Sequence, residues 1–272
     1  MLKHQEHTGI HYAVEGSGHP VILIHGIAAS LRDWVDLSAQ LVPAGYCAYA
    51  LDLPGHGESF KPENLEDYHI DRLFHALEGW IQGLQLEEPA VFIGHSLGGY
   101  LSLRYACYHP EMVRALILFD PYYSPRQISP VLMRINRRPG LSARVLRRVP
   151  EHLIRMALSL DLSSGISRDA RLRVVADYKR ASPYLSYTAH TLDDLTESLP
   201  GITAPTLVLW GEKDLTLKPV SFPNLIARLP NACGEGIAGC RHQPHTCRPG
   251  LVNGLVFEFL SGLEKNSSER RG

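Results

Sequence analysis

The chain has 272 residues, of which 44% are hydrophobic and 20% are charged, and its formal net charge is −1. This composition is ordinary for a folded globular protein and excludes a fibrous or disordered chain. The length allows one large core with room for an inserted subdomain, so an enzyme or a binding protein is expected.

The first residues, MLKHQEHTGIHYAVEG, lack a charged segment followed by an apolar run, so no secretory signal is predicted. The longest apolar runs, such as VILI at 21–24 and ALILF at 115–119, are too short to cross a bilayer. Five cysteines form an odd number without framework spacing, which favours a reducing compartment over a disulfide scaffold. These features predict a cytoplasmic protein without a membrane span.

Short β-type runs alternate along the chain with longer helical ones. Buried parallel strands are nearly continuous apolar sequences, and five runs have this character: 20–26, 46–52, 89–95, 113–120 and 205–211. Apolar residues at helical spacing mark three segments between them: 30–42, 69–84 and 97–110. The alternation predicts an α/β fold, with a mostly parallel, doubly wound sheet covered by helices on both faces.

The alternation stops between residues 121 and 199, where a helical pattern with proline and glycine breaks replaces the strands. Between 126 and 180 there are thirteen basic and four acidic residues, about +9, which leaves about −10 for the rest of the chain. A last helix at 250–263 precedes a polar tail, 264–272, that we expect to be disordered. The sequence therefore predicts a core from 1–120 and 200–263 with 121–199 as a helical insertion.

Residues 94–98 read Gly-His-Ser-Leu-Gly, the G-x-S-x-G pattern, between a predicted strand and a predicted helix. An abrupt strand-to-helix turn forces the serine into a strained conformation, and the glycines two residues away on either side give the backbone room. The helix start also directs N–H groups and a positive dipole end at that point, which suits a developing oxyanion. We therefore predict Ser96 as a nucleophile rather than as part of a structural turn.

With this motif in place, the chain resembles the α/β-hydrolase fold family over essentially all of its length, and the insertion occupies the position of that family's helical cap. His25-Gly26 matches the family's oxyanion loop. The resemblance implies that the backbone N–H groups of Ile27 and Leu97 form the oxyanion hole, and Trp34 follows at the expected distance.

The stretch DLPGHGES, residues 52–59, is similar to the family's loop after the next strand. Three of its residues belong to types that can act in catalysis: Asp52, His56 and Ser59. We expect them to shape this loop, because short polar side chains commonly hydrogen-bond to nearby backbone in turns.

A serine nucleophile needs a base, and the base needs a carboxylate that orients it. In this fold the three follow in the order serine, acid, histidine. Asp214, after the strand at 205–211, lies where the resemblance places the acid, and Asp120 at the end of the preceding strand is the rival.

The base is expected within GCRHQPHTC, residues 239–247. The resemblance aligns His242 with the family's histidine, although Arg241 stands where a glycine is usual and Cys247 where a glutamate is common. His245 is the alternative base and is otherwise expected to pack or to line the pocket.

A zinc site is the competing interpretation of the same stretch, since its two cysteines and two histidines are zinc-binding residue types. All four lie within eight residues and lack the separated ligand pairs usual for zinc: Cys240, His242, His245 and Cys247. No metal and no other cofactor is therefore expected.

The resemblance implies a serine hydrolase that cleaves carboxylic esters through an acyl-enzyme. Ser96 argues against the family's dehalogenases and epoxide hydrolases, which use aspartate at this position. A carbon–carbon bond hydrolase with the same three residues stays open, although His95 replaces the asparagine common there. A binding or receptor protein that has kept the fold and lost rapid turnover is the third possibility.

The expected partner is a small-molecule ester. The basic, amphipathic stretch 133–158 could attract an anionic substrate or an acidic lipid surface, but a solvated helical face is the favoured interpretation. Nucleic-acid binding is not expected, because stacking aromatics are not interleaved with the basic residues. Four tyrosines that flank the cap are candidates to line the pocket: Tyr122, Tyr123, Tyr184 and Tyr187.

Overall fold

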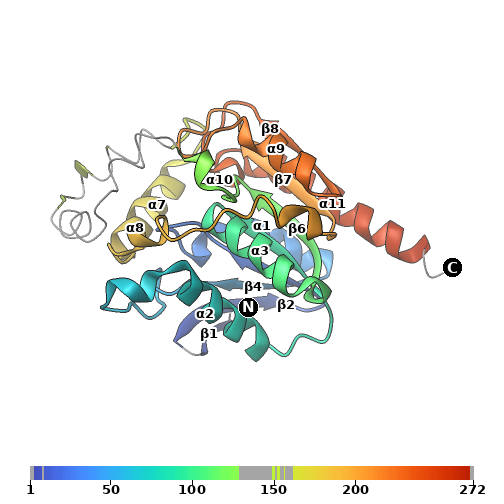
Figure 1. Ribbon diagram of the computed structural model, residues 1–272, viewed down its shortest axis with the longest axis horizontal. Helices are drawn as coiled ribbons and strands as arrows, with labels where there is room; N and C mark the ends of the chain where they lie inside the picture. The colour runs from blue at the N-terminus through green and yellow to red at the C-terminus, as the bar shows by residue number, and fades with distance from the viewer. Residues whose placement is uncertain are drawn as a thin grey trace.

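The computed structural model describes residues 3–7, 9–128, 149, 150, 152, 153, 156 and 162–269. Within these residues the centre is an eight-stranded sheet in the order β1-β2-β4-β3-β5-β6-β7-β8 (Figure 1). The β1–β2 and β2–β4 pairs are antiparallel, and every other neighbouring pair is parallel. The predicted α/β fold with a mostly parallel sheet is confirmed.

The five predicted strands correspond to strands of the sheet, each within two residues at either end: β3 (His19–Ile24), β4 (Tyr46–Leu51), β5 (Ala90–His95), β6 (Val113–Phe119) and β7 (Thr206–Gly211). Three further strands were not predicted: β1 (Lys3–His7), β2 (Ile10–Gly16) and β8 (Ala232–Ile237). They lie at the two ends of the sheet order. β1 and β8 are the edge strands, and β2 is paired antiparallel on both sides, so none of the three has the continuous apolar run of a buried parallel strand. The β8 sequence, ACGEGI, is largely exposed.

Helices cover both faces of the sheet. One face carries α2 (Ile70–Gly83), α3 (Leu97–Tyr108) and α9 (Ser221–Arg228), and the other carries α1 (Val35–Leu41) and α11 (Pro249–Glu269). Alternate residues of β3 divide between the two cores: Ile22 and Ile24 pack with the first set, Val21 and Leu23 with the second. Successive side chains of a strand point to opposite faces, and burying each of these side chains contributes about 1.5–3 kcal/mol.

Between β6 and β7, residues 121–199 form what we call the insertion. Its described residues contain no β-strand, in line with the helical pattern of the sequence, and its main helices are α7 (Arg168–Arg180) and α8 (Leu185–Thr188). The stretch 133–158, on which the anionic-surface hypothesis rests, lies almost wholly outside the described residues.

Several short elements complete the described chain: η1 (Leu31–Trp34), η2 (Val42–Ala44), η3 (Leu65–Tyr68), η4 (Pro110–Met112), η5 (Pro125–Gln127), η6 (Leu199–Gly201) and α10 (Pro244–Cys247). In the described part of the chain, no helix combines the length and the apolar character that a membrane span requires.

The C-terminal end differs from expectation. Helix α11 continues to Glu269, so the polar stretch that we predicted to be disordered from residue 264 is helical for six further residues. No glycine or proline follows Gly262 before Glu269 to end the helix. The hydroxyl of Tyr46 also donates a hydrogen bond of 2.9 Å to the Glu264 carboxylate, which ties this turn to the sheet.

Candidate active site

Ser96 stands at the turn between β5 and α3, in a left-handed backbone conformation (φ 50°, ψ −108°). Both flanking glycines are sterically required. A Cβ at Gly98 would lie 2.0 Å from the Ile24 carbonyl oxygen, and one at Gly94 would lie 2.5 Å from the backbone of Gly98. The strand, the turn and the helix can approach each other this closely only because both positions lack side chains.

The structure brings three of the predicted site residues together. His242 Nε2 lies 3.0 Å from Ser96 Oγ, and His242 Nδ1 lies 2.8 Å from Asp214 Oδ2. An ionised carboxylate only accepts hydrogen bonds, so it selects the tautomer with the proton on Nδ1. The lone pair of Nε2 is then directed at the serine hydroxyl.

Asp214 is held on its other oxygen. Its Oδ1 accepts hydrogen bonds from the backbone N–H of Thr216 at 2.7 Å and of Leu217 at 3.0 Å. Asp214 is 5% exposed and His242 is 7% exposed, so the hydrogen bond between them is shielded from water. A buried, doubly anchored carboxylate keeps the imidazole in one orientation.

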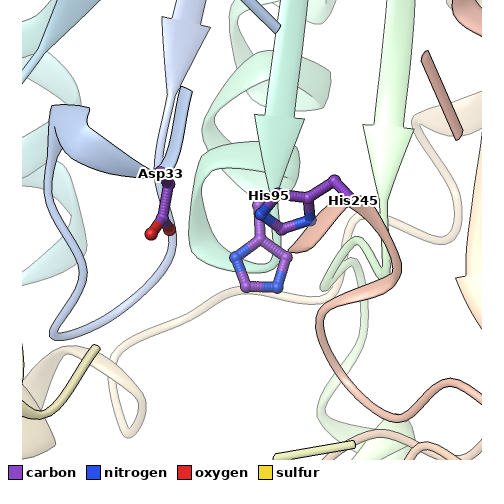
Figure 2. Close-up of side chains that lie close together, drawn as sticks. All are labelled: Asp33, His95 and His245. Carbon is purple, nitrogen blue, oxygen red and sulfur yellow. The ribbon is translucent and has the colours of Figure 1, made fainter. Parts of the chain in front are cut away.

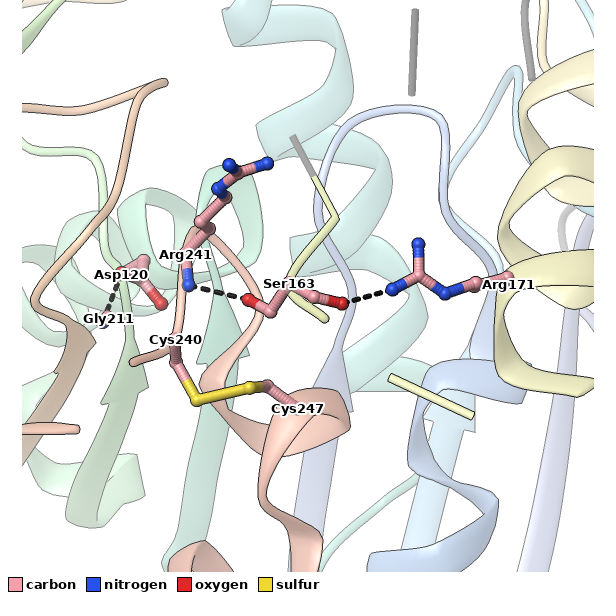
Figure 3. Close-up of a disulfide and its surroundings, with 7 residues drawn as sticks. All are labelled: Asp120, Ser163, Arg171, Gly211, Cys240, Arg241 and Cys247. Carbon is pink, nitrogen blue, oxygen red and sulfur yellow. Dashed lines mark hydrogen bonds between the residues drawn. A yellow bond between two sulfur atoms is a disulfide. The ribbon is translucent and has the colours of Figure 1, made fainter. Parts of the chain in front are cut away.

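The rival acid, Asp120, makes a different contact. Its Oδ1 accepts a hydrogen bond of 2.9 Å from the backbone N–H of Gly211 (Figure 3), and its Oδ2 has no partner among the described residues. Complete burial, followed by the neighbouring Asp214 carboxylate, raises the pKa of Asp120 well above its usual value. The carboxylate hydrogen-bonded to His242 is therefore that of Asp214.

The loop after β3 approaches the serine directly. A Cβ at Gly26 would lie 3.3 Å from Ser96 Cβ and 2.7 Å from His95 Nδ1, so only glycine fits there. Leu53 N–H donates to His25 Nε2 at 3.1 Å, which ties the loop to the end of β4. Ile27, the next residue, is 38% exposed, whereas Leu97 is buried at the start of α3.

The loop at 52–59 is built around Asp52. Its carboxylate accepts backbone hydrogen bonds from Leu31 at 2.8 Å and from Glu58 at 2.9 Å, and it contacts His11 Nδ1 at 2.9 Å. Burial would raise the pKa of this carboxyl, but His25 and these bonds bring it below the usual value. These contacts fit the structural role expected of Asp52.

The histidine loop contains a disulfide that the sequence did not predict. Cys240 and Cys247 are bonded to each other (Figure 3). Cys47, Cys107 and Cys233 are free. The expectation that the cysteines form no bridge was therefore wrong for this pair. The two cysteines are only seven positions apart in the sequence. The short helix α10, which ends at Cys247, turns the chain so that their sulfur atoms meet. A zinc site made of both thiolates and both histidines is excluded by the same bond.

Arg241, in place of the usual glycine, connects this loop to the insertion. Its backbone N–H donates to Ser163 Oγ at 2.7 Å, and the Ser163 carbonyl in turn accepts from Arg171 on α7 (Figure 3). The chain before His242 is therefore held from the insertion side as well as by the disulfide.

His245 lies away from the serine, in an aromatic stack. Its ring lies 5.2 Å from that of Trp34 and 5.2 Å from that of Phe119, nearly parallel to both. Burial, and secondarily His242, lower the pKa of His245 to about 3. The structure thus brings His242, and not the alternative base His245, to Ser96.

His95 was considered in the sequence only as the residue before the nucleophile. Its Nε2 lies 2.7 Å from the carbonyl oxygen of His242, so it supports the backbone of the loop that carries the imidazole. Burial, and then the neighbouring His245 and His242, lower the pKa of His95 well below its usual value. Only the folded chain reveals this contact, because the two residues are 147 positions apart.

The four tyrosines proposed for the pocket make specific structural contacts. Tyr122 N–H donates to the Ser96 carbonyl at 3.1 Å, and the Tyr123 hydroxyl donates to the Ser221 carbonyl at 2.9 Å. The Tyr187 hydroxyl donates to Glu66 at 2.9 Å, and the ring of Tyr184 lies 5.8 Å from that of Tyr68. The backbone of Tyr122 is thus hydrogen-bonded to that of Ser96.

The chain is similar to several known proteins over most of its length. A family model described as alpha/beta hydrolase fold matches residues 19–246. Bifunctional epoxide hydrolase 2 of Sus scrofa is 35% identical over an alignment that covers 94% of this chain and 54% of the relative. The rat enzyme of that name is likewise covered over 54%, so the chain spans about half the length of these relatives.

Two solved structures have similar folds. A thermophilic esterase from Thermogutta terrifontis has a TM-score of 0.79 and 24% identity, with 97% of this chain and 99% of that chain covered. A bromoperoxidase from Bacillus anthracis has a TM-score of 0.79 and 23% identity, with 93% and 95% covered. The activities in these names differ, so the likeness concerns the fold and leaves the reaction to the side chains of the site.

Proposed function

Since this chain belongs to the α/β-hydrolase fold family, we propose that it is a serine hydrolase that cleaves carboxylic esters through an acyl-enzyme. The observation that carries the proposal is the position of the His242 ring, which is hydrogen-bonded on one nitrogen to Asp214 and on the other to Ser96. A hydroxyl becomes a useful nucleophile when such an oriented base accepts its proton.

In the acylation step, Ser96 Oγ attacks the ester carbonyl carbon while its proton passes to His242 Nε2. The N–H groups of Ile27 and Leu97 stabilise the resulting oxyanion, a role supported by the contact of Gly26 with Ser96 and by the start of α3 at Leu97. The tetrahedral species collapses, the carbon–oxygen bond to the alcohol breaks, and His242 returns the proton to the leaving alcohol.

Deacylation repeats these steps with water. His242 takes a proton from the attacking water, the second tetrahedral species forms at the same carbonyl, and the proton returns to Ser96 Oγ as the carboxylic acid leaves. Asp214 stays ionised throughout and stabilises the imidazolium form of His242. No cofactor takes part in acylation or deacylation as proposed.

An epoxide hydrolase activity, suggested by the relative from Sus scrofa, is not supported by the site. That chemistry in this family uses an aspartate as nucleophile, and the position between Gly94 and Gly98 is Ser96. A serine forms an ester with an acyl group and is regenerated by hydrolysis, which matches the proposed reaction.

We further propose that the insertion acts as a cap over this site and contributes to substrate choice. The contacts that support it are those of Ser163 with Arg241 and of α7 with the loop after β3. They attach the insertion beside both the base and the proposed oxyanion loop.

A panel of p-nitrophenyl esters of increasing acyl length tests the proposal, with Ser96→Ala as the control. The wild type should turn over at least the shorter esters, and Ser96→Ala should lower kcat by roughly 10⁴- to 10⁶-fold with its folding unchanged. An alkyl fluorophosphonate should add one adduct on Ser96. Equal turnover by the variant would exclude Ser96 as the nucleophile, and labelling of Ser96 without ester turnover would favour a carbon–carbon bond hydrolase.

A further inference from the structure

A second group of chemically reactive side chains lies behind the nucleophile turn. Asp33 comes from η1, His95 from the end of β5 and His245 from α10 (Figure 2). One ligand-type atom from each residue lies within 4.8 Å of the others. These residues reach one place from three separate parts of the chain.

The polar atoms of this group lack the partners that burial normally requires. Within the described part of the chain, no hydrogen-bond partner is found for Asp33 Oδ2, His95 Nδ1 or either ring nitrogen of His245. Each buried polar atom without a partner costs about 1–3 kcal/mol. His95 is 3% exposed and His245 is 7% exposed, so bulk water does not compensate for these losses. Four such atoms together indicate that something else occupies the space between them.

The tautomer of His95 favours a cation as that occupant. A carbonyl oxygen only accepts, so the 2.7 Å contact with the His242 carbonyl requires the proton on His95 Nε2. The Nδ1 atom is then a lone-pair donor. Histidines that bind metals commonly hold their other N–H on a backbone carbonyl in this manner.

The ring of His245 is equally restrained. It packs against the rings of Trp34 and Phe119, which also contact each other, and these contacts hold its plane without using its nitrogens. A pocket is lined by Asp33, Trp34 and His245, so it borders two of the three residues of the group and gives an ion a route toward them.

The charges around the pocket argue against a simple anion site. Two arginines line it, but each already faces a carboxylate: Arg32 donates to Asp177, and Arg173 lies 3.9 Å from Asp36. Asp33 has no such salt bridge among the described residues. One carboxylate and two neutral imidazoles are the ligand set of a divalent transition metal.

We propose that Asp33, His95 and His245 form a binding site for a divalent transition metal of the Zn²⁺ class. Tetrahedral Zn²⁺ with bonds of about 2.1 Å separates its ligand atoms by about 3.4 Å. The present limit of 4.8 Å therefore requires only small side-chain movements. The ion would connect η1 to the strand before Ser96 and to the loop after His242. This inference is independent of the proposed ester hydrolysis.

The test is titration of the metal-stripped 272-residue chain with Zn²⁺ by calorimetry and with Co²⁺ by visible absorption, which reports nitrogen and oxygen ligation. His245→Phe removes both nitrogens and keeps an aromatic ring packed against Trp34 and Phe119. Asp33→Asn removes the charge at nearly constant shape. We expect one ion per chain in the wild type, and each variant should weaken binding at least about tenfold.

Other metal-binding side chains need matched controls. Cys233 is exposed and free, so every protein in the series carries Cys233→Ser. His75 pairs with Glu78 on the surface, and His75→Gln should leave the affinity within about twofold. Retained folding of each variant is checked by circular dichroism.

Each result of the titration either supports the metal site or overturns it. Loss of binding in His245→Phe and Asp33→Asn, with binding kept in the controls, supports the site. No Zn²⁺ or Co²⁺ binding by the wild type overturns it and assigns the space to buried water, which satisfies polar cavities of this kind. Unchanged binding in both variants, or loss of binding in His75→Gln, also overturns it.

Discussion

Asp177, on α7 of the insertion, accepts a hydrogen bond of 2.9 Å from the hydroxyl of Ser30, which lies in the loop after β3. The same carboxylate accepts a hydrogen bond from Arg32 and is 1% exposed. A buried carboxylate with two partners is a strong constraint, because moving α7 would leave a charge without compensation. The insertion is thus attached directly beside Gly26 and Ile27.

Replacing Asp177 with alanine should loosen this attachment. We expect the free energy of unfolding to fall by about 2–3 kcal/mol, below the full value for a buried pair because Arg32 is partly exposed. Ester kcat should fall more than KM rises, since the proposed oxyanion loop loses its support. Urea unfolding and steady-state kinetics measure both. Asp169→Ala, an exposed acid on the same helix, is the control, and an equal effect there would contradict the role of Asp177.

The two candidate acids should behave differently when each is made an amide. Asp214→Asn removes the acceptor that holds the Nδ1 proton of His242, and kcat should fall about 10⁴-fold. Asp120→Asn preserves the acceptor for Gly211 N–H and should change kcat less than about tenfold. Steady-state kinetics of both variants on the same ester decide which carboxylate is the catalytic acid. A larger loss in Asp120→Asn than in Asp214→Asn would assign the acid to Asp120.

The buried state of Asp120 also predicts a dependence of stability on pH. Its pKa in the folded protein lies well above the unfolded value of about 4. Between these two values the folded state binds more protons than the unfolded state. The contribution of this residue is therefore fully present below about pH 4 and declines as pH rises through the folded pKa.

Asp120→Asn cannot titrate and serves as the comparison. Relative to wild type, the unfolding free energy of the variant should increase as pH rises above about 4. Urea denaturation at several pH values measures this difference. A difference that stays constant with pH would mean that Asp120 is ionised in the folded protein.

The disulfide should stabilise the loop that carries His242. Its cysteines are seven positions apart, and closing a loop of this length contributes about 2 kcal/mol in the chain-entropy account. The double variant Cys240→Ser, Cys247→Ser should lose about that much stability and several-fold in kcat, because the base becomes less well positioned. Dithiothreitol should have the same effect on the wild type.

Cys233→Ser provides the matched control for that experiment, since Cys233 is exposed and free. It should leave both stability and kcat near the wild-type values. Thiol titration of the unfolded chain, with two fewer reactive groups than the reduced form, checks the bridge itself. Five free thiols in the oxidised protein would contradict the bond.

Local sequence was enough to predict the centre of the molecule. Continuous apolar runs predicted the five parallel strands at its middle, because both faces of those strands are buried. The edge strands β1 and β8, and β2 next to β1, escaped this reasoning, since their stability depends on pairing with a neighbour rather than on their own residues. The helical turn at Glu264 likewise involves a distant residue, because its carboxylate accepts a hydrogen bond from Tyr46 of β4.

Local sequence also determined the nucleophile turn, because the strain at Ser96 and the glycines that relieve it lie within five residues. Long-range packing decided the rest. The hydrogen bond of His242 to Asp214, the bond between Cys240 and Cys247, and the meeting of Asp33 with His95 and His245 all depend on where separate segments come to lie. A sequence pattern records neighbours along the chain, whereas hydrogen bonds and ligand groups require atoms within a few ångströms in space, and only the folded sheet and its helices set those distances.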